Sequence, residues 1–368
     1  MPTRPRIAVA MSGGVDSSVA ALVLQQQGMD VHGITFRLFP CDWAAGNDAT
    51  GSCCSTRDVN DAVRVAARLS IPHSILDLTE IFTSRVVEPF IASYKAGETP
   101  NPCILCNQHV KFNAFLTWAL EQGFDAIATG HHARLESRAD RLALLPGADS
   151  AKDQTYFLFA MPQQTLARVF FPVGIMAKQE VRERAAAAGL PVAEKKESQE
   201  ICFAAGGSYA DFLERHGGIQ ANPGPIVLAD GAVVGEHQGL HRYTIGQRKG
   251  LGVAAGKPLY VLCRELARNR LIIGPREALL ENSLSAHSPV WTRGEPPVPG
   301  SVVEARIRYR SSTVPARITA CCEAGFSLSF EEPVAGIAPG QAVVLYDRSE
   351  VVGGGWIRTS GEGACGHG

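Results

Sequence analysis

The chain has 368 residues, a formal net charge of −1, 45% hydrophobic residues and 19% charged residues. This length allows two or three domains, and the composition excludes a disordered chain and a uniformly basic one. No segment approaches the roughly 20 consecutive apolar residues of a membrane span, so no membrane partner is expected. The ten cysteines, without a recognisable signal peptide, favour a reducing compartment. We therefore expect a cytoplasmic protein.

Strand-like and helix-like segments alternate over the first 130 residues. Short apolar runs predict strands, and longer runs that end at glycine or proline predict helices. The alternation predicts an α/β domain over residues 1–205 with a parallel sheet covered on both faces. The predicted strands are 7–10, 31–38, 74–78 and 126–129, and the predicted helices are 17–27, 59–69 and 110–122, with Ser55 and Asp58 as a capping box before the second helix.

After about residue 205 the pattern changes to short β-type runs separated by glycine and proline. It predicts two small β-rich modules, over 206–280 and 281–360, of which the last is a β-barrel. Residues 361–368 carry no apolar pattern and are expected to fray. The predicted strands are 226–228, 259–262, 271–273, 302–309, 326–330 and 342–346.

A glycine-rich segment, Met11-Ser12-Gly13-Gly14-Val15-Asp16-Ser17-Ser18, lies between the first predicted strand and helix. Glycines let the backbone approach a ligand closely and a helix N-terminus binds anions, so the segment predicts a phosphate site. It lacks the lysine of the G-x-x-x-x-G-K-S/T loop and the spacing of G-x-G-x-x-G. It resembles the PP-loop of ATP pyrophosphatases. Asp16 is a candidate Mg²⁺ ligand, with capping of the helix as the alternative.

Three cysteines lie in motifs suited to thiol chemistry. Cys103 and Cys106 occupy the turn Thr99-Pro100-Asn101-Pro102-Cys103-Ile104-Leu105-Cys106, and Cys202 follows much later. A thiol near a helix N-terminus ionises more easily and is a better nucleophile. Zinc binding would need a second pair at similar spacing, which the adjacent pairs at 53–54 and 321–322 do not provide. The pair at 321–322 fits buried, small apolar positions instead, as do Cys41 and Cys263.

Seven segments occur in one order along almost the whole chain: MSGGVDSS, TPNPCILCN with KFNAFL, ATGHHAR, KDQTYFL, SQEICF, GQRKGLG and GGGWI. Together they resemble the tRNA-specific 2-thiouridylase family, which thiolates the wobble uridine of certain tRNAs. The resemblance implies an adenine nucleotide alpha hydrolase-like PP-loop fold and a tRNA-uridine 2-sulfurtransferase that uses ATP and Mg²⁺. ATP would adenylate the uracil C2 oxygen, and sulfur would then replace it with release of AMP and pyrophosphate. A cysteine desulfurase or a sulfur-relay protein is implied as the sulfur donor.

The resemblance also implies roles for individual residues. Cys202 would carry sulfur as a persulfide, and Cys106 would be the partner nucleophile. A Cys106–Cys202 disulfide needs the two Cα atoms within about 7 Å, so we expect the segment with Cys202 to move over the site. Asn101, Pro102 and Cys103 are expected to line the target base. ATP is expected at Ala10, Met11, Ser12, Gly13, Gly14, Val15, Asp16, Ser17, Phe36 and Gly130, and tRNA at His131, Lys152, Asp153, Gln154, Arg308, Tyr309 and Gln341.

Cys103 departs from a common form of the family, which has aspartate at this position. The departure creates a Cys-x-x-Cys pair that, with Cys202, offers three ligands to a 4Fe–4S cluster. An iron–sulfur-dependent tRNA thiolase is therefore one alternative. A PP-loop synthetase acting on a small molecule is another. A non-catalytic tRNA-binding protein is the third, although the intact Gly13-Gly14-Val15-Asp16-Ser17 loop argues against it.

Overall fold

A five-stranded parallel sheet organises the N-terminal domain of the computed structural model, which describes residues 4–40, 43, 56–196, 201–204, 207–254 and 256–358. The strand order is β3-β2-β1-β4-β7, and each neighbouring pair is parallel. The strands are β1 (Arg6–Ala10), β2 (Asp30–Arg37), β3 (His73–Asp77), β4 (Ala126–Ala128) and β7 (Val169–Phe170). The predicted parallel α/β sheet is confirmed.

The sheet is covered on both faces, because alternate residues of its central strand enter two different buried clusters. Ala8 packs in one cluster, and its neighbours Ile7 and Val9 pack in the other. The second cluster contains side chains of α1 (Val15–Gln26), α2 (Thr56–Leu69) and α8 (Lys178–Ala187). Four residues named in the sequence predictions, Ser55, Cys41, Cys53 and Cys54, lie outside the described residues.

Two long helical segments cover the other face, and each contains a stretch of wider, π-type turns. The first comprises α3 (Thr79–Phe82), η2 (Thr83–Val87) and α4 (Glu88–Lys95), and the second α5 (Pro102–Leu105), η3 (Cys106–Ala114) and α6 (Phe115–Glu121). The sequence pattern predicted only 110–122. The helix begins earlier because Pro102 occupies its first turn and the Asn101 side chain accepts a hydrogen bond from the Cys103 N–H at 3.1 Å.

A small sheet is inserted in the N-terminal domain between β4 and β7, and the central module follows that domain. A two-stranded sheet, β5 (Ala133–Ser137) with β6 (Leu142–Pro146), follows β4. The central module contains α9 (Tyr209–His216) and a four-stranded sheet of order β10-β11-β8-β9. Its strands are β8 (Gly224–Leu228), β9 (Val233–His237), β10 (Tyr260–Glu265) and β11 (Arg270–Gly274). None of the helices in the described part of the chain is both long and apolar enough to cross a bilayer.

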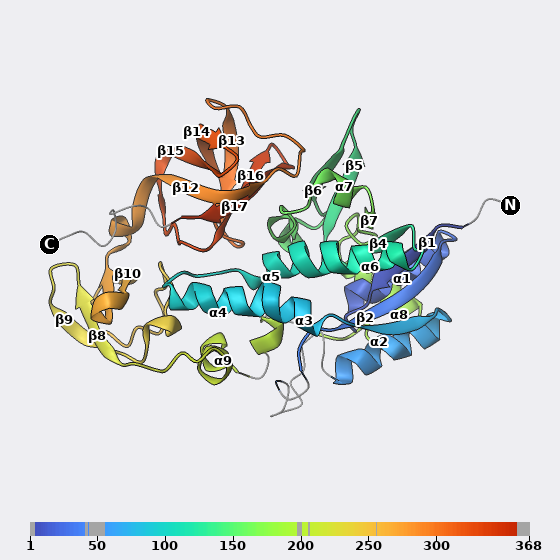
Figure 1. Cartoon of the computed structure of the whole chain (residues 1–368), viewed down its shortest axis with the longest axis horizontal. Helices are drawn as coiled ribbons and strands as arrows, with labels where there is room; N and C mark the ends of the chain where they lie inside the picture. Colours follow the sequence, from blue (N-terminus) through green and yellow to red (C-terminus); the bar gives the residue numbers. More distant parts are fainter. Residues whose placement is uncertain are drawn as a thin grey trace.

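A closed six-stranded barrel completes the fold, as predicted, and lies beside the central module, away from α2 (Figure 1). Its strands, in chain order, are β12 (Leu280–Val290), β13 (Val302–Arg306), β14 (Val314–Cys322), β15 (Gly325–Ala335), β16 (Ala342–Asp347) and β17 (Glu350–Ile357).

Two sequence predictions for the barrel are wrong. The strand expected at 302–309 ends at Arg306, so Arg308, Tyr309 and Arg310 lie in a turn. The Arg308 guanidinium there points back to main-chain carbonyls of Ile245 and Gly336, and these tertiary contacts override the local strand pattern. The 321–322 pair was expected to be buried, but Cys322 is exposed and Cys321 only partly buried, because neighbouring residues of a barrel strand face opposite sides.

Candidate active site

The glycine-rich loop lies at the carboxyl edge of the sheet, between β1 and α1 and beside the end of β4. Gly13 has a φ of 69°, and a Cβ atom there would lie 2.2 Å from the main-chain oxygen of Asp58. A Cβ atom on Gly130, just after β4, would lie 2.5 Å from the main-chain nitrogen of Ser17. Both positions therefore require glycine. Ligands of open α/β sheets bind at this edge.

Hydroxyl groups fold the loop around the start of α1. Ser17 Oγ accepts from the Ser12 N–H at 3.2 Å, and Ser18 Oγ donates to the Gly14 carbonyl at 2.7 Å. The N-cap residue is Gly14, and no side-chain hydrogen bond caps the helix among the described residues. Asp16, the second residue of the helix, is therefore not the cap, and that alternative is wrong. The first N–H groups of α1 are left to bind an anion.

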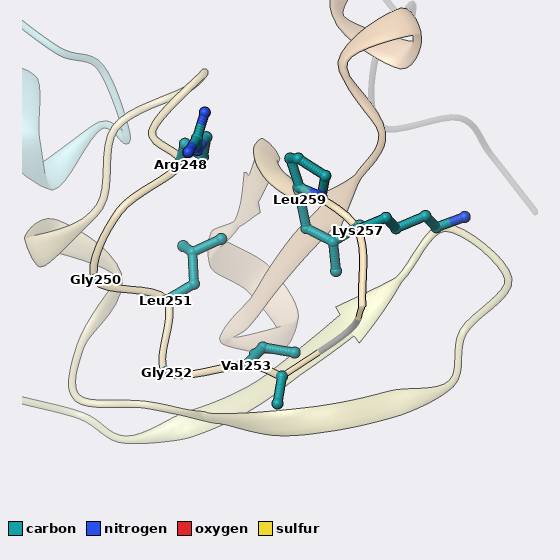
Figure 2. A pocket seen from close by; sticks show the side chains of 9 residues that line it. Arg248, Gly250, Leu251, Gly252, Val253, Lys257 and Leu259 are labelled. Carbon is teal, nitrogen blue, oxygen red and sulfur yellow. The ribbon is translucent and has the colours of Figure 1, made fainter.

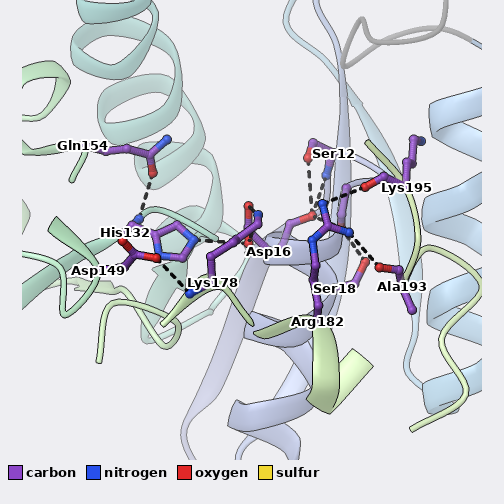
Figure 3. Close-up of polar contacts among 12 residues, drawn as sticks. Ser12, Asp16, Ser18, His132, Asp149, Gln154, Lys178, Arg182, Ala193 and Lys195 are labelled. Carbon is purple, nitrogen blue, oxygen red and sulfur yellow. Dashed lines mark hydrogen bonds and ion pairs between the residues drawn. The ribbon is translucent and has the colours of Figure 1, made fainter. Parts of the chain in front are cut away.

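Asp16 instead accepts hydrogen bonds from two basic side chains (Figure 3). Lys178 Nζ lies 2.7 and 2.6 Å from its two carboxylate oxygens, and His132 Nε2 lies 3.2 Å from Oδ1. Burial acts to raise the pKa of Asp16, but the hydrogen bonds from His132 and Lys178 outweigh it and hold that pKa below its ordinary value. The carboxylate is therefore ionised at pH 7 and fixes a buried lysine beside the loop.

A second lysine, Lys195, ties the loop to α2. Its Nζ donates to the Gly13 carbonyl at 2.9 Å and to Asp61 Oδ2 at 2.6 Å, and it also pairs with Asp58. Burial acts to lower the pKa of Lys195, but the hydrogen bonds that it donates to Asp58 and Asp61 raise that pKa above its ordinary value. The ammonium group therefore stays charged and holds the Gly13 turn against the first turn of α2.

We expect Gly13→Ala to destabilise the protein by about 2–4 kcal/mol, because the new Cβ adds both a strained backbone conformation and a clash with Asp58. Gly28→Ala is the matched control: its φ is 82°, but nothing lies within 4 Å of its Cβ position. It should cost only about 1 kcal/mol from strain. Urea denaturation measures the free energy of unfolding of both variants. Equal losses of stability in the two variants would contradict the close approach of Gly13 to Asp58.

The loop and all three motif cysteines line one cavity of about 880 Å³. This volume lies within the range of about 300–1,000 Å³ typical of ligand pockets. Cys106 is buried in the first turns of the helix that begins at Pro102, Cys103 is exposed beside it, and Cys202 lies partly buried in the short turn η6 (Cys202–Ala204). Residues that are far apart in the sequence thus share one chamber.

Most residues predicted to bind ATP, the target base or tRNA also line this cavity. They are Ala10, Met11, Ser12, Gly14, Val15, Asp16, Ser17, Phe36, Gly130, Pro102, Cys103, His131, Lys152, Asp153, Gln154 and Tyr309.

Four predicted residues are not part of the cavity wall. Gly13 shapes the loop, and Asn101 caps the helix at Pro102. Arg308 donates to the Ile245 carbonyl at 2.8 Å and so joins the central module to the barrel. Gln341 Nε2 donates to the Thr99 carbonyl at 2.6 Å. These contacts place all four in structural positions around the site.

Three of the predicted tRNA residues also have internal partners. Asp153 pairs with Arg306 at 3.0 Å, the Gln154 side chain accepts from the His132 N–H at 2.8 Å, and Tyr309 packs on Phe157 with ring centroids 4.3 Å apart. Burial, with the charges of Lys111 and His132, holds the pKa of His131 well below its ordinary value, so its imidazole is neutral at pH 7.

Basic side chains predominate on the cavity wall. Among the described lining residues, seven lysines and arginines face three aspartates, and each aspartate already pairs with a basic group. Such a surface favours a polyanionic ligand. The basic residues are Lys111, Lys152, Lys178, Lys195, Lys196, Arg306 and Arg310.

Sequence reasoning missed Lys178 and Lys195. Lys178 begins α8, and Lys195 follows that helix, far from the loop in sequence. The one local signal was the charged Lys195-Lys196 pair shortly before Cys202. No group of three or more His, Cys, Asp or Glu side chains in the described part of the chain is arranged to hold a metal ion, so Cys103, Cys106 and Cys202 do not form a ready cluster site.

A second cavity, of about 450 Å³, lies in the central module and contains none of the residues predicted to bind ATP or the target base or to carry sulfur. The GQRKGLG segment forms much of its wall, with Arg248 and Leu251 opposite Lys257 and Leu259 (Figure 2). The active-site motifs therefore converge on the larger cavity alone.

Family comparisons agree with this architecture. Residues 5–206 match the tRNA methyl transferase HUP domain, 210–275 the tRNA methyl transferase PRC-barrel domain, and 281–357 the aminomethyltransferase beta-barrel domain. With the loop at the sheet edge, these matches define a protein with an N-terminal α/β HUP domain followed by two β-rich domains.

Individual relatives are similar over nearly the whole chain. The tRNA-specific 2-thiouridylase MnmA of Geotalea uraniireducens is 46% identical over 359 residues, covering 96% of this chain and 95% of the relative. That of Moorella thermoacetica is 47% identical over 357 residues, covering 95% and 99%. The chain belongs to the tRNA-specific 2-thiouridylase family of sulfur-transferring, tRNA-modifying enzymes.

Proposed function

We propose that this chain catalyses the ATP-dependent 2-thiolation of the wobble uridine of tRNA. The observation that carries the proposal is that the PP-loop, Cys106 and Cys202 line one cavity with a basic wall. A small-molecule synthetase would need neither the two distant cysteines nor a wall that extends to Arg306 and Arg310 of the barrel segment.

The first step activates the base. The C2 carbonyl of uracil is a poor electrophile, and its oxygen is a poor leaving group. Attack of that oxygen on the α-phosphorus of ATP forms the adenylate, breaks the bond to the β-phosphate and releases pyrophosphate. The N–H groups at the start of α1 and the Lys178 ammonium then stabilise the charge that develops on pyrophosphate.

The second step transfers sulfur. A persulfide on Cys202 supplies the sulfur, and Cys106 attacks the Cys202 sulfur atom, which forms the Cys106–Cys202 disulfide and releases hydrosulfide. Hydrosulfide adds to C2, and AMP departs with the former oxygen. In the alternative order, the terminal sulfur of the Cys202 persulfide attacks C2 directly and AMP departs. Cys106 then attacks the Cys202 sulfur atom, which forms the same disulfide and leaves the sulfur on the base, so the overall reaction is the same. In either order a cellular thiol reductant must restore the two thiols before the next turnover.

The remaining predicted residues are proposed to contact the target base or the rest of the tRNA. Asn101, Pro102 and Cys103 would contact the flipped base, whose extrusion costs a few kcal/mol. The tRNA would contact His131, Lys152, Asp153, Gln154, Arg308, Tyr309 and Gln341, of which Lys152 and Arg308 carry the positive charge that its phosphates need. For Arg308 and Gln341 this requires donors other than those already bound to carbonyl groups.

Mg²⁺ fits the site as a cation held largely by ATP phosphates, because Mg²⁺ usually takes one or two carboxylates and several other oxygens. Asp16 is the loop carboxylate that would hold it, and the ion pair with Lys178 must then open. The ion would neutralise phosphate charge. A desulfurase or relay protein would load Cys202, and a reducing cytoplasm would keep Cys106 and Cys202 as thiols.

Anaerobic single-turnover thiolation tests this function. We expect 2-thiouridine, AMP and pyrophosphate in equal amounts when the protein is mixed with ATP, a sulfide or desulfurase source, and unmodified tRNA with a wobble uridine. The matched control is the same tRNA with cytidine at the wobble position. Equal release of pyrophosphate with the uridine tRNA and the cytidine tRNA would contradict the proposal. Release of AMP and pyrophosphate without any tRNA would contradict it as well.

A further inference from the structure

Thr99 immediately precedes the proline-braced turn that ends at Cys103, and residues of both β-rich modules bind it. Its N–H donates to the Pro339 carbonyl at 2.9 Å, and its carbonyl accepts from Gln341 Nε2 at 2.6 Å. Its hydroxyl accepts from Arg264 Nη2 at 3.0 Å. Thr99 is buried. Every polar group of this residue is therefore bound from outside its own domain.

Arg264, on β10, makes the contact from the central module. Its side chain is buried, and the same Nη2 atom also donates to the Gly97 carbonyl at 2.6 Å, while Nη1 donates to the Tyr243 carbonyl at 3.0 Å. A planar guanidinium reaches several acceptors at once, whereas a lysine ammonium is a single flexible point charge. Arg264 thus bridges its own module and the approach to the cysteine turn.

Close backbone packing supports the same junction. Gly340 has a φ of 83°, and a Cβ atom there would lie 2.9 Å from Glu98 Cβ and 3.1 Å from the Thr99 nitrogen. On the other side, a Cβ atom on Gly97 would lie 2.9 Å from Leu266 Cδ1. The chain at 97–99 therefore lies in direct contact with the barrel and with the central module.

The segment from Thr99 to Cys103 is stiff. Pro100 and Pro102 each fix one φ angle, and Asn101 binds the Cys103 N–H through its side chain. A shift at Thr99 is therefore passed to Cys103, which lines the active cavity.

We propose that Arg264 is a positioning residue, which acts through Thr99 to fix the turn that holds the target base. The inference rests on the proposed function, because that function makes Asn101, Pro102 and Cys103 the base-contacting turn. From the barrel, the loop Pro339–Gln341 binds the main chain of Thr99 and so helps to fix the same turn. The catalytic geometry thus depends on correct docking of both β-rich modules.

Alkylation of Cys103 by a maleimide, read by peptide mass spectrometry without substrates, tests the positioning directly. We expect it to be about five-fold faster in Arg264→Lys and in Thr99→Val, because a loosened turn no longer holds the exposed Cys103 side chain in one orientation and the thiol meets the reagent more often. Thr99→Ser keeps the hydroxyl and is the matched control, with a rate close to wild type. Cys322, exposed on β14, serves as the internal reference. Unchanged Cys103 rates in both test variants would overturn the proposal.

Steady-state thiolation provides the second measurement. We expect kcat at saturating tRNA to fall at least ten-fold in Arg264→Lys and Thr99→Val, with the Kd for ATP unchanged and recovery in Thr99→Ser. A parallel loss of ATP binding and thermal stability, or a change confined to the KM for tRNA, would overturn the positioning role. If wild type makes no 2-thiouridine, the proposed function fails, whereas the alkylation rates still decide whether Arg264 positions the turn.

Discussion

Cys202→Ser and Cys106→Ser are each expected to reduce single-turnover thiolation by about 10³-fold or more, because each removes a sulfur atom that must form or break a bond. Both variants should still bind ATP and form the adenylate, since the PP-loop is separate from either thiol. Adenylated tRNA should therefore accumulate in both. Quantifying adenylated and thiolated nucleosides by mass spectrometry after one turnover measures the two steps separately.

Cys103→Ser is the control for this pair, and it should retain activity within about three-fold of wild type if the persulfide carries sulfur. Iron is measured in every sample. If all three cysteines are required and activity follows the iron content, sulfur passes through a cluster and the persulfide mechanism is wrong. Full activity of Cys202→Ser would contradict the assignment of the sulfur carrier.

Lys178→Met is expected to slow adenylate formation by about 10²–10³-fold, the loss typical of removing one preorganised charge donor from an active site. Lys178 Nζ contacts both carboxylate oxygens of Asp16, which fixes the ammonium at the phosphate loop. Lys95→Met, an exposed position at the end of α4, is the control and should stay within two-fold of wild type. Pyrophosphate release in rapid-quench experiments measures the step.

The same variant carries a stability signature that depends on pH. The lowered pKa of Asp16 means that its stabilising effect is complete above its ordinary pKa and is lost as the pH falls through the lowered value. Without Lys178 the carboxylate stays partly buried, and among the described residues His132 is its remaining hydrogen-bond partner. We expect a loss of about 2 kcal/mol at pH 7 that shrinks towards pH 3. A deficit that does not change with pH would contradict the ion pair.

The sequence predicted those strands and loops whose conformation depends mainly on neighbouring residues in the chain. Strand β1 and the glycine-rich loop were predicted closely, because an apolar run followed by glycines before a helix has few alternatives. The segment 79–95 was missed, because its π-type turns shift the apolar positions away from the usual helical spacing. The 302–309 strand failed at Arg308, whose contacts lie in other parts of the chain.

The candidate site shows the same division. Asp16, Cys106 and Cys202 were predicted from short sequence motifs, and all three line the cavity. Each could be predicted because its reactive group and its neighbours in the sequence form one recognisable motif. Lys178 joins them only because α8 packs against α1, and that contact is a property of the tertiary fold. The ion pair between Asp153 and Arg306 likewise joins two modules, and neither residue's neighbourhood in the sequence contains a sign of it.

The hydrogen bond between Thr99 and Gln341 spans 242 residues of sequence, which has a consequence for the newly made chain. During synthesis at about 5–20 residues per second, the catalytic domain, which ends near residue 205, leaves the ribosome roughly 7–27 seconds before Gln341, the barrel residue that completes this contact. The phosphate loop can form in that interval, but the turn from Thr99 to Cys103 still lacks the hydrogen bond from Gln341. We therefore expect a newly made chain to gain tRNA-modifying activity only after its last domain has folded.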